Sequence, residues 1–272
     1  MLIIGEKING TLKGIGAAIN QRNAEAITAA VRKQDLAGAD VIDVNAGTGK
    51  TQGPAEIEDL QWLLGVVQKA TAKPLAIDSE NPEVIAAGLQ LVKGPTPWIN
   101  SASAAPARLE SILALARNTG GPVIALCMDE KGIPTSREGR LKAAERIYRA
   151  AREKGINPEC LYFDPLVMPI CANDKAGVMN LELISSIKTS FPGARTVVGL
   201  SNISFGLPQR EVVNQTFLTL CLQAGLDAAI MDPTRVNTLM ALRAADAILG
   251  RDRICRRYMQ TYRTISSEKK PG

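Results

Sequence analysis

Short apolar runs recur along the chain and alternate with longer segments of mixed polarity. Apolar runs of this length are typical of parallel strands that are buried on both faces. The eight runs cover residues 2–5, 41–44, 75–77, 98–100, 123–127, 161–163, 196–200 and 228–231. Between them, apolar residues return at helical spacing, for example at Ile57, Leu60, Leu64 and Val67, which predicts amphipathic helices. The pattern therefore predicts strands that alternate with helices.

The predicted helices also have recognisable ends. They begin near prolines such as Pro82 and stop at glycines such as Gly120. Eight strand and helix units without a break in composition predict an α/β fold, a single-domain (β/α)8 TIM barrel over residues 1–250, with a C-terminal extension over residues 251–272. The alternative is a doubly wound open sheet. It is disfavoured because residues 5–10 read Gly-Glu-Lys-Ile-Asn-Gly and lack the G-x-G-x-x-G phosphate loop.

Polar residues close or directly follow these apolar runs. In a barrel the carboxyl ends of the strands meet at one edge, which is where active-site groups lie. A single Asp or Asn at such a place can equally be a helix cap or a turn former, but their joint recurrence predicts a site for a flat heterocycle rich in hydrogen-bond donors. The set comprises Glu6, Asn9, Asp43, Asn45, Asp78, Asn100, Asp129, Asp164, Asn202 and Asp232.

The composition excludes several kinds of chemistry. The 272 residues include no histidine, so histidine acid/base catalysis, a Ser-His or Cys-His nucleophile and a histidine-bound metal are excluded within this chain. The five cysteines show no C-x-x-C spacing, which favours reduced thiols in a cytoplasmic protein and argues against structural zinc. We therefore expect no metal bound by this chain.

Charge and hydropathy limit the partners. The formal net charge is +5, but Lys and Arg are dispersed and only 4% of residues are aromatic, so we expect no nucleic acid. The basic cluster at residues 251–257 indicates a solvated terminal segment. No apolar window of about 18 residues occurs, and the N-terminus has no basic region before an apolar stretch, so we expect no membrane span and no secretion signal.

Six strand ends carry motifs that together resemble a known family. They read Gly-Glu-Lys-Ile-Asn at 5–9, Ile-Asp-Val-Asn at 42–45, Ile-Asp-Ser at 77–79, Trp-Ile-Asn-Ser at 98–101, Phe-Asp-Pro-Leu at 163–166 and Gly-Leu-Ser-Asn-Ile-Ser-Phe-Gly at 199–206. From residue 1 to about 263 the chain resembles the methyltetrahydrofolate:corrinoid-protein methyltransferases, and the folate module of cobalamin-dependent methionine synthase. The resemblance implies a pterin-binding barrel. It also implies methyl transfer between N5 of tetrahydrofolate and the cobalt of a corrinoid, in either direction, including from methylcorrinoid to tetrahydrofolate in a demethylation pathway.

Folate recognition can be assigned to particular residues. A pterin presents a ring N–H beside an amino group, and one carboxylate accepts both; we assign Asp164 to this pair, as the resemblance also implies. Asp78 and Asn100 would face the other ring donors and acceptors, although Asp78 has the alternative of capping the helix that begins near Pro82. The remaining expected folate contacts are Glu6, Asp43, Asn45, Gly199, Ser201 and Arg210. For Arg210 the expected role is to close over the ligand or meet its glutamate tail, and the alternative is a surface salt bridge.

Asn202 is the expected catalytic residue. Its amide can donate to neutral N5 and accept from protonated N5–H, so it follows both states of N5 without titrating, while the proton comes from solvent. The alternative is that Asn202 caps the helix over 212–224.

Two other functions stay open. A dihydropteroate synthase-like enzyme would share the barrel, but that family carries a Ser-Arg-Lys segment at strand seven and a late Arg-x-His, whereas Asn202 stands in the first place and histidine is absent. The third hypothesis is that the protein is a non-catalytic folate-binding subunit. The chain also lacks the D-x-H-x-x-G signature of cobalamin modules, so the resemblance implies a separate corrinoid protein as partner, and relatives commonly form homodimers.

Overall fold

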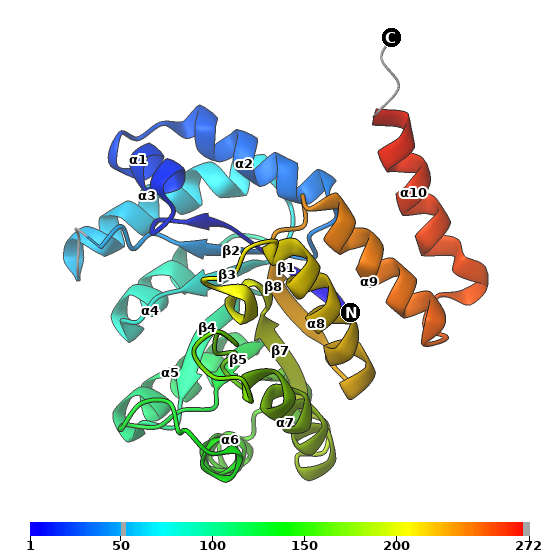
Figure 1. Ribbon diagram of the computed structural model, residues 1–272. Coiled ribbons are helices and arrows are strands. Elements are labelled where there is room, and N and C mark those ends of the chain that lie inside the picture. The colour runs from blue at the N-terminus through cyan, green and yellow to red at the C-terminus, as the bar shows by residue number, and fades with distance from the viewer. Residues whose placement is uncertain (50–52, 269–272) are drawn as a thin grey trace.

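The computed structural model describes residues 1–49 and 53–268, and over these ranges the chain forms a closed barrel of parallel strands in chain order (Figure 1). The strands are β1 Leu2–Asn9, β2 Val41–Asn45, β3 Leu75–Asp78, β4 Trp98–Ser103, β5 Val123–Leu126, β6 Leu161–Asp164, β7 Arg195–Gly199 and β8 Ala228–Met231. The (β/α)8 prediction is confirmed. The open sheet is excluded because β8 pairs with β1.

Helices surround the barrel. They are α1 Lys13–Asn20, α2 Ala24–Leu36, α3 Pro54–Ala70, α4 Pro82–Leu91, α5 Pro106–Thr119, α6 Arg137–Glu153, α7 Ala176–Ser190, α8 Arg210–Ala224, α9 Val236–Ile248 and α10 Arg256–Glu268, with short 3-10 turns η1 Pro158–Cys160, η2 Leu200–Ser204 and η3 Arg253–Cys255. α3, α4 and α5 begin at proline, and α5 ends at Gly120 in the left-handed conformation that glycine tolerates. α10 lies outside the ring and packs on α9 (Figure 1). Within the described ranges, no helix is both long and apolar enough to cross a membrane.

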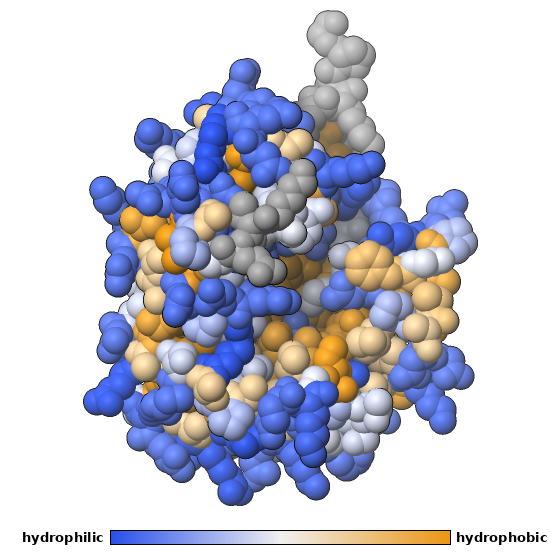
Figure 2. All heavy atoms as spheres, turned by 90° about the vertical axis from the view of Figure 1, so that its left-hand side faces the viewer, coloured by the Kyte–Doolittle hydropathy of each residue, from blue (hydrophilic) through white to orange (hydrophobic). Residues whose placement is uncertain are grey.

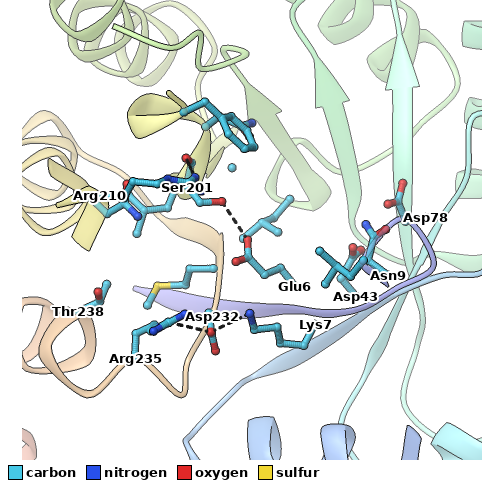
Figure 3. A pocket seen from close by; sticks show the side chains of 18 of the residues that line it. Glu6, Lys7, Asn9, Asp43, Asp78, Ser201, Arg210, Asp232, Arg235 and Thr238 are labelled. Carbon is cyan, nitrogen blue, oxygen red and sulfur yellow. Dashed lines mark hydrogen bonds and ion pairs between the residues drawn. The ribbon is translucent and has the colours of Figure 1, made fainter. Parts of the chain in front are cut away.

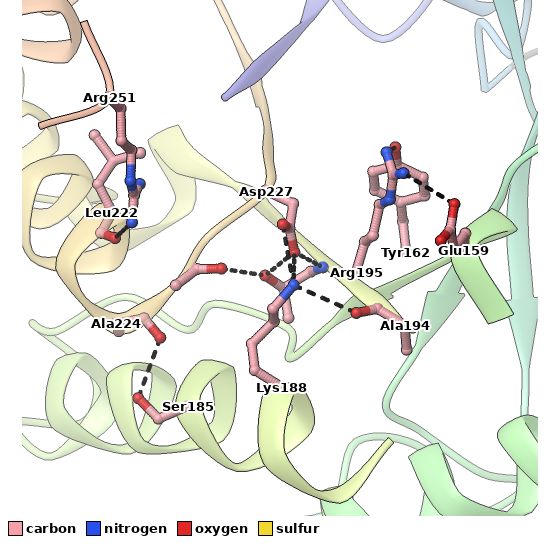
Figure 4. Close-up of polar contacts among 12 residues, drawn as sticks. Glu159, Tyr162, Ser185, Lys188, Ala194, Arg195, Leu222, Ala224, Asp227 and Arg251 are labelled. Carbon is pink, nitrogen blue, oxygen red and sulfur yellow. Dashed lines mark hydrogen bonds and ion pairs between the residues drawn. The ribbon is translucent and has the colours of Figure 1, made fainter. Parts of the chain in front are cut away.

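The barrel interior is filled near the amino ends of the strands. Its buried layer consists of Ile4, Val41, Ala76, Trp98, Ile124, Tyr162, Val197 and Ala228. The Trp98 and Tyr162 rings lie 4.5 Å apart and fill much of the width. Beneath them, Arg195 donates to the Tyr162 hydroxyl at 2.9 Å and Lys188 pairs with Asp227 at 2.9 Å (Figure 4). This end of the barrel is therefore closed by packing and ion pairs.

The next inward layer positions the candidate site. Alternate residues of a strand face the same side, so the residue two positions after each member of the buried layer also points inward. These residues are Glu6, Asp43, Asp78, Asn100, Leu126, Asp164, Gly199 and Ile230. Five of the eight are acids or amides. The polar strand ends of the sequence are thus one layer of the barrel. Figure 2 shows a hollow near the centre of one face, with hydrophobic side chains close to it and hydrophilic ones mainly toward the outline.

Candidate active site

A cavity of about 570 Å³ opens at the carboxyl end of the barrel (Figure 3). It is lined by nine of the residues predicted from the sequence: Glu6, Asp43, Asp78, Asn100, Asp164, Gly199, Ser201, Asn202 and Arg210. Asn45, also predicted for the site, is not among the residues that line the cavity. These nine residues come from six strands or the segments that follow them, and Asp232 after β8 adds a seventh.

A bulge in β1 brings two consecutive side chains into the cavity. Gly5 pairs with Ile42 and Ile8 pairs with Val44, so β1 has one residue more than β2 across this interval. Both Glu6 and Lys7 consequently line the cavity, although regular alternation would separate them. The backbone N–H of Lys7 donates to Gln34 Oε1 at 3.0 Å. Gly5 leaves space for this contact, because a Cβ at this position would lie 2.5 Å from that oxygen and would displace the Gln34 side chain.

Two amides orient two of the acids. Asn100 Nδ2 donates to Asp43 Oδ1 at 3.0 Å, and Asn45 Nδ2 donates to Asp78 Oδ2 at 2.8 Å. The Asn45 oxygen accepts from the backbone N–H of Gly47, and these two bonds fix the side chain that orients Asp78. The ligand contact expected of Asn45 stays a prediction.

Asp78 does not cap α4. The side chain of Asn81 accepts from the Glu83 N–H at 2.9 Å and provides that cap. Asp78 Oδ1 is thereby left for the cavity. The alternative that Asp78 caps α4 is therefore excluded.

Burial disfavours the ionised form of the acids on the cavity floor and so raises their pKa values. It raises the pKa of Asp164 to about 6, against partial offsets from the Leu166 N–H and Arg140. Burial likewise raises the pKa of Asp78 to about 6. The pKa of Asp43 is raised well above its ordinary value, by burial first and then by the neighbouring Asp78 carboxylate, and burial also raises the pKa of Glu6. A ligand that donates hydrogen bonds to these oxygens would stabilise their ionised forms.

Asp164 is held by the turn after β6. Its Oδ1 accepts from the Leu166 N–H at 2.7 Å, while Leu166 has a left-handed φ of 64°. The buried Arg140 of α6 donates from Nη1 to the carbonyls of Pro165 at 2.6 Å and Leu166 at 2.7 Å. Arg140 therefore fixes the turn that aims Asp164. No pattern in the sequence indicates this role, because it depends on a contact with a residue 25 positions away.

Asn202 lies on η2, directly above the end of β7. A Cβ at Gly199 would lie 2.9 Å from Asn202 Nδ2, so the glycine makes room for this amide. Within the described ranges, the Asn202 side chain has no hydrogen-bond partner, and it lines the cavity. The alternative role as a helix cap is excluded, because α8 begins at Arg210 and its N-cap is Gln209.

Arg210 braces the loop that carries Asn202. Its Nη2 donates to the Ser201 carbonyl at 2.8 Å, its Nε donates to Ser204 Oγ at 3.0 Å, and its guanidinium lies 4.6 Å from the Phe205 ring centre. Ser201 Oγ in turn donates to Glu6 Oε2 at 3.4 Å, which links β7 to β1. Arg210 therefore contacts the loop itself, and the alternative of a surface salt bridge does not describe these contacts.

Sequence reasoning missed an ion-pair cluster on the cavity wall. Asp232 Oδ2 lies 3.0 Å from Lys7 Nζ and 3.3 Å from Arg235 Nε. Burial alone would raise the pKa of Asp232, but hydrogen bonds from Thr234 and Lys7 hold it below its ordinary value. Lys7 belongs to the motif at residues 5–9 and Asp232 directly follows a predicted strand, so both could have been found from the sequence. No pattern in the sequence points to Arg235.

Asp129 was expected at the carboxyl edge and is not part of the cavity. It forms a tight turn with Gly132, and its Oδ1 accepts from the Lys131 N–H at 2.9 Å. The turn-forming role of Asp therefore prevails here. Across the described part of the chain, no three His, Cys, Asp or Glu side chains are grouped so that they could hold a metal ion.

Comparison with known proteins identifies the family. A family model described as "Pterin binding enzyme" matches residues 9–232, which is most of the chain. The chain belongs to this pterin-binding family. The family prediction made from the six motifs is confirmed by this match. Asp43, Asp78 and Asp164 fall within the matched range, and Glu6 lies just before it.

Individual relatives refine the comparison. The methylcorrinoid:tetrahydrofolate methyltransferase of Eubacterium limosum is 36% identical over 265 residues, which cover 97% of this chain and 96% of that protein. The methionine synthase of Mycobacterium tuberculosis is 28% identical over 249 residues, covering 87% of this chain and 21% of the larger protein. Among solved structures, the dihydropteroate synthase of Yersinia pestis superposes with a TM-score of 0.67 at 16% identity, covering 92% of this chain and 94% of that one. At this identity the last likeness shows the fold alone.

Proposed function

We propose that the protein transfers a methyl group between N5 of tetrahydrofolate and the cobalt of a corrinoid carried by a separate protein. The observation that carries the proposal is the inward layer of acids and amides beneath the unpartnered Asn202. The name of the Eubacterium limosum relative supports the same reaction in the direction from methylcorrinoid to tetrahydrofolate. That direction would suit a demethylation pathway.

Asp164 binds the pyrimidine edge of the pterin. One of its oxygens already accepts from the Leu166 N–H, and the carboxylate has further lone pairs for the ring N–H and the amino group. Asp78 Oδ1 and the Asn100 side-chain oxygen face the other ring atoms, since their remaining atoms are engaged with Asn45 and Asp43. Each bond to a donor of the ligand offsets part of the burial penalty that raises the pKa of Asp164 and Asp78.

Asn202 acts at N5. In the direction toward tetrahydrofolate, N5 attacks the cobalt-bound methyl, the cobalt to carbon bond breaks with its electron pair on cobalt, and N5 carries positive charge until its proton leaves. The Asn202 oxygen accepts from the N5–H during this step, and in the reverse direction its amide donates to N5. Because the amide does not titrate, the proton passes to solvent.

The other residues support these contacts. Gly199 leaves space for the Asn202 amide, Ser201 and Glu6 join the two sides of the pocket, and Arg210 braces the loop. Asp43 orients Asn100, and Asn45 orients Asp78.

The partners follow from the same chemistry. A corrinoid protein docks over the open end of the barrel, where N5 would be presented. The protein works in the cytoplasm, in keeping with five free cysteines among the described residues. It forms a homodimer, as members of the resembling methyltransferase family commonly do, and binds no metal of its own.

Absorption spectroscopy distinguishes this function from a dihydropteroate synthase-like condensation. Mixing the protein with tetrahydrofolate and a methylated corrinoid protein should convert the methylcob(III)alamin spectrum to that of cob(I)alamin under anaerobic conditions. In parallel, p-aminobenzoate and pterin pyrophosphate should not be consumed. An unchanged cobalt spectrum with consumption of p-aminobenzoate would replace the proposal by the synthase reaction, and an unchanged spectrum with tight folate binding would favour a non-catalytic folate-binding subunit.

A further inference from the structure

Positive charge gathers on one side of a cavity whose floor is acidic. Lys7 on β1, Arg210 on α8 and Arg235 before α9 all line it. Figure 3 shows Asp43 and Asp78 on one side of the view, and Arg210 and Arg235 on the other. The cavity therefore has an acidic end and a basic end. In the proposed methyl transfer the pterin ring contacts only the acidic end and Asn202.

The cations on β1 and before α9 are held in place by one carboxylate. Asp232 Oδ1 accepts from the Thr234 N–H at 3.0 Å and from its hydroxyl at 2.6 Å. Its Oδ2 forms ion pairs with both Lys7 and Arg235. Asp232 neutralises one of its two cations, and Arg210 adds a third cation to this wall. Glu6 and Glu211 also line the cavity and offset part of this charge, Glu6 less so because burial raises its pKa. The Arg235 side chain is 65% exposed, so its guanidinium is accessible to a ligand.

A buried acceptor without a donor lies on the same wall. The side-chain oxygen of Asn214, on α8, is buried and has no hydrogen-bond partner among the residues the structure describes. Asn214 lines the cavity one helical turn beyond Arg210. A buried acceptor left unpaired is unfavourable, so an N–H group of a bound ligand would satisfy it.

The shape of folate connects these observations, and this step rests on the proposed function. C6 is bonded to N5 and carries the p-aminobenzoyl-glutamate tail. If Asp164 holds the pyrimidine edge and Asn202 lies at N5, the tail must leave the ring on the side of β7, β8 and β1. That is the side on which Lys7, Arg235 and Asn214 lie.

We infer that Arg235 and Lys7, aligned by Asp232, bind a carboxylate of the folate glutamate tail, while the Asn214 oxygen accepts an N–H of the tail linkage. The planar guanidinium of Arg235 matches a carboxylate geometrically, and Lys7 adds a second charge. The site thereby selects tail-bearing folates over simple pterins. It also keeps the tail to one side of the pocket, so that the space above N5 stays open.

Calorimetric titration of two ligands tests this inference. Tetrahydrofolate carries the tail, and 6-methyltetrahydropterin has the same ring without it. Arg235→Gln should weaken tetrahydrofolate binding by roughly tenfold and leave the affinity for the tailless pterin unchanged, because a single exposed charged hydrogen bond is lost. Raising the salt concentration should weaken tetrahydrofolate binding to the wild type and leave pterin binding unaffected.

A matched control is Arg149→Gln on α6. Arg149 is 73% exposed, pairs with Glu145 and lies outside the cavity, so its variant should bind both ligands as the wild type does. Tetrahydrofolate affinity unchanged in Arg235→Gln, or an equal loss for both ligands, would overturn the inference and leave the proposed function intact. Failure of the wild type to bind tetrahydrofolate would instead refute the proposed function, and this inference with it.

Discussion

Replacing Asp164 by Asn should stabilise the free protein while impairing folate binding. Burial raises the pKa of this carboxyl from 3.8 to about 6. A raised pKa means that the folded state holds the proton more tightly than the unfolded state, so stability is full below pH 3.8, falls between 3.8 and about 6, and stays reduced above that. Each pKa unit corresponds to about 1.4 kcal/mol, so the ionised carboxylate destabilises the folded protein by about 3 kcal/mol at pH 7.5.

Asn is neutral and still offers an oxygen to the Leu166 N–H, so Asp164→Asn avoids this penalty. We expect a gain of about 1 to 3 kcal/mol in the free energy of unfolding at pH 7.5, shrinking toward zero near pH 4. Tetrahydrofolate affinity should fall by roughly 10- to 100-fold, because charged acceptors for the pterin are lost.

Urea unfolding at a series of pH values, together with calorimetric folate titration at pH 7.5, measures both effects. The control is Asp174→Asn, which changes an exposed carboxylate in the loop before α7 and should alter neither quantity. A variant at Asp164 that is less stable than the wild type at pH 7.5, or whose stability difference does not change with pH, would refute the electrostatic reasoning. Unchanged folate affinity would remove Asp164 from the site.

Three further outcomes are expected. Asn202→Ala should slow single-turnover methyl transfer by roughly 100-fold or more, with a much smaller loss of folate affinity; equal losses in both would reduce Asn202 to a positioning residue. Gly199→Ala should also slow transfer, because its methyl group displaces the Asn202 amide, whereas Gly65→Ala, with open space around it, should not; a normal rate in Gly199→Ala would contradict the packing argument. Hydrogen exchange at residues 168–175 and 206–210 should slow when the corrinoid protein binds, and protection confined to the amino-terminal rim would contradict docking at the cavity.

Much of the fold and the cavity floor could be predicted because one simple rule governs them. Strand side chains alternate, so an acid or amide two residues after a buried apolar position must face the same interior. Asp43, Asp78 and Asp164 obey this rule, and their places follow from the sequence once the apolar runs are recognised as strands.

The residues that sequence reasoning missed depend on departures from that rule or on contacts between distant parts of the chain. Lys7 reaches the cavity through a bulge in β1, and its backbone N–H there donates a hydrogen bond to Gln34 Oε1 on α2. Arg140 acts through backbone carbonyls that lie far along the chain. Asn45 obeys the strand pattern, yet its amide is consumed by Asp78 and Gly47. Such local competition for hydrogen bonds is decided by tertiary packing, which no single-sequence pattern records.

Transfer of an isotopically labelled methyl group tests the central claim most directly. A corrinoid protein carrying a ¹³C-methyl group on cobalt is incubated with catalytic amounts of this protein and excess tetrahydrofolate, and the products are followed by ¹³C NMR. The account predicts that the label appears on N5 of tetrahydrofolate, at a rate strongly reduced by Asn202→Ala. Label that remains on cobalt with the wild-type protein, or that reaches tetrahydrofolate at the same rate without it, would contradict the account.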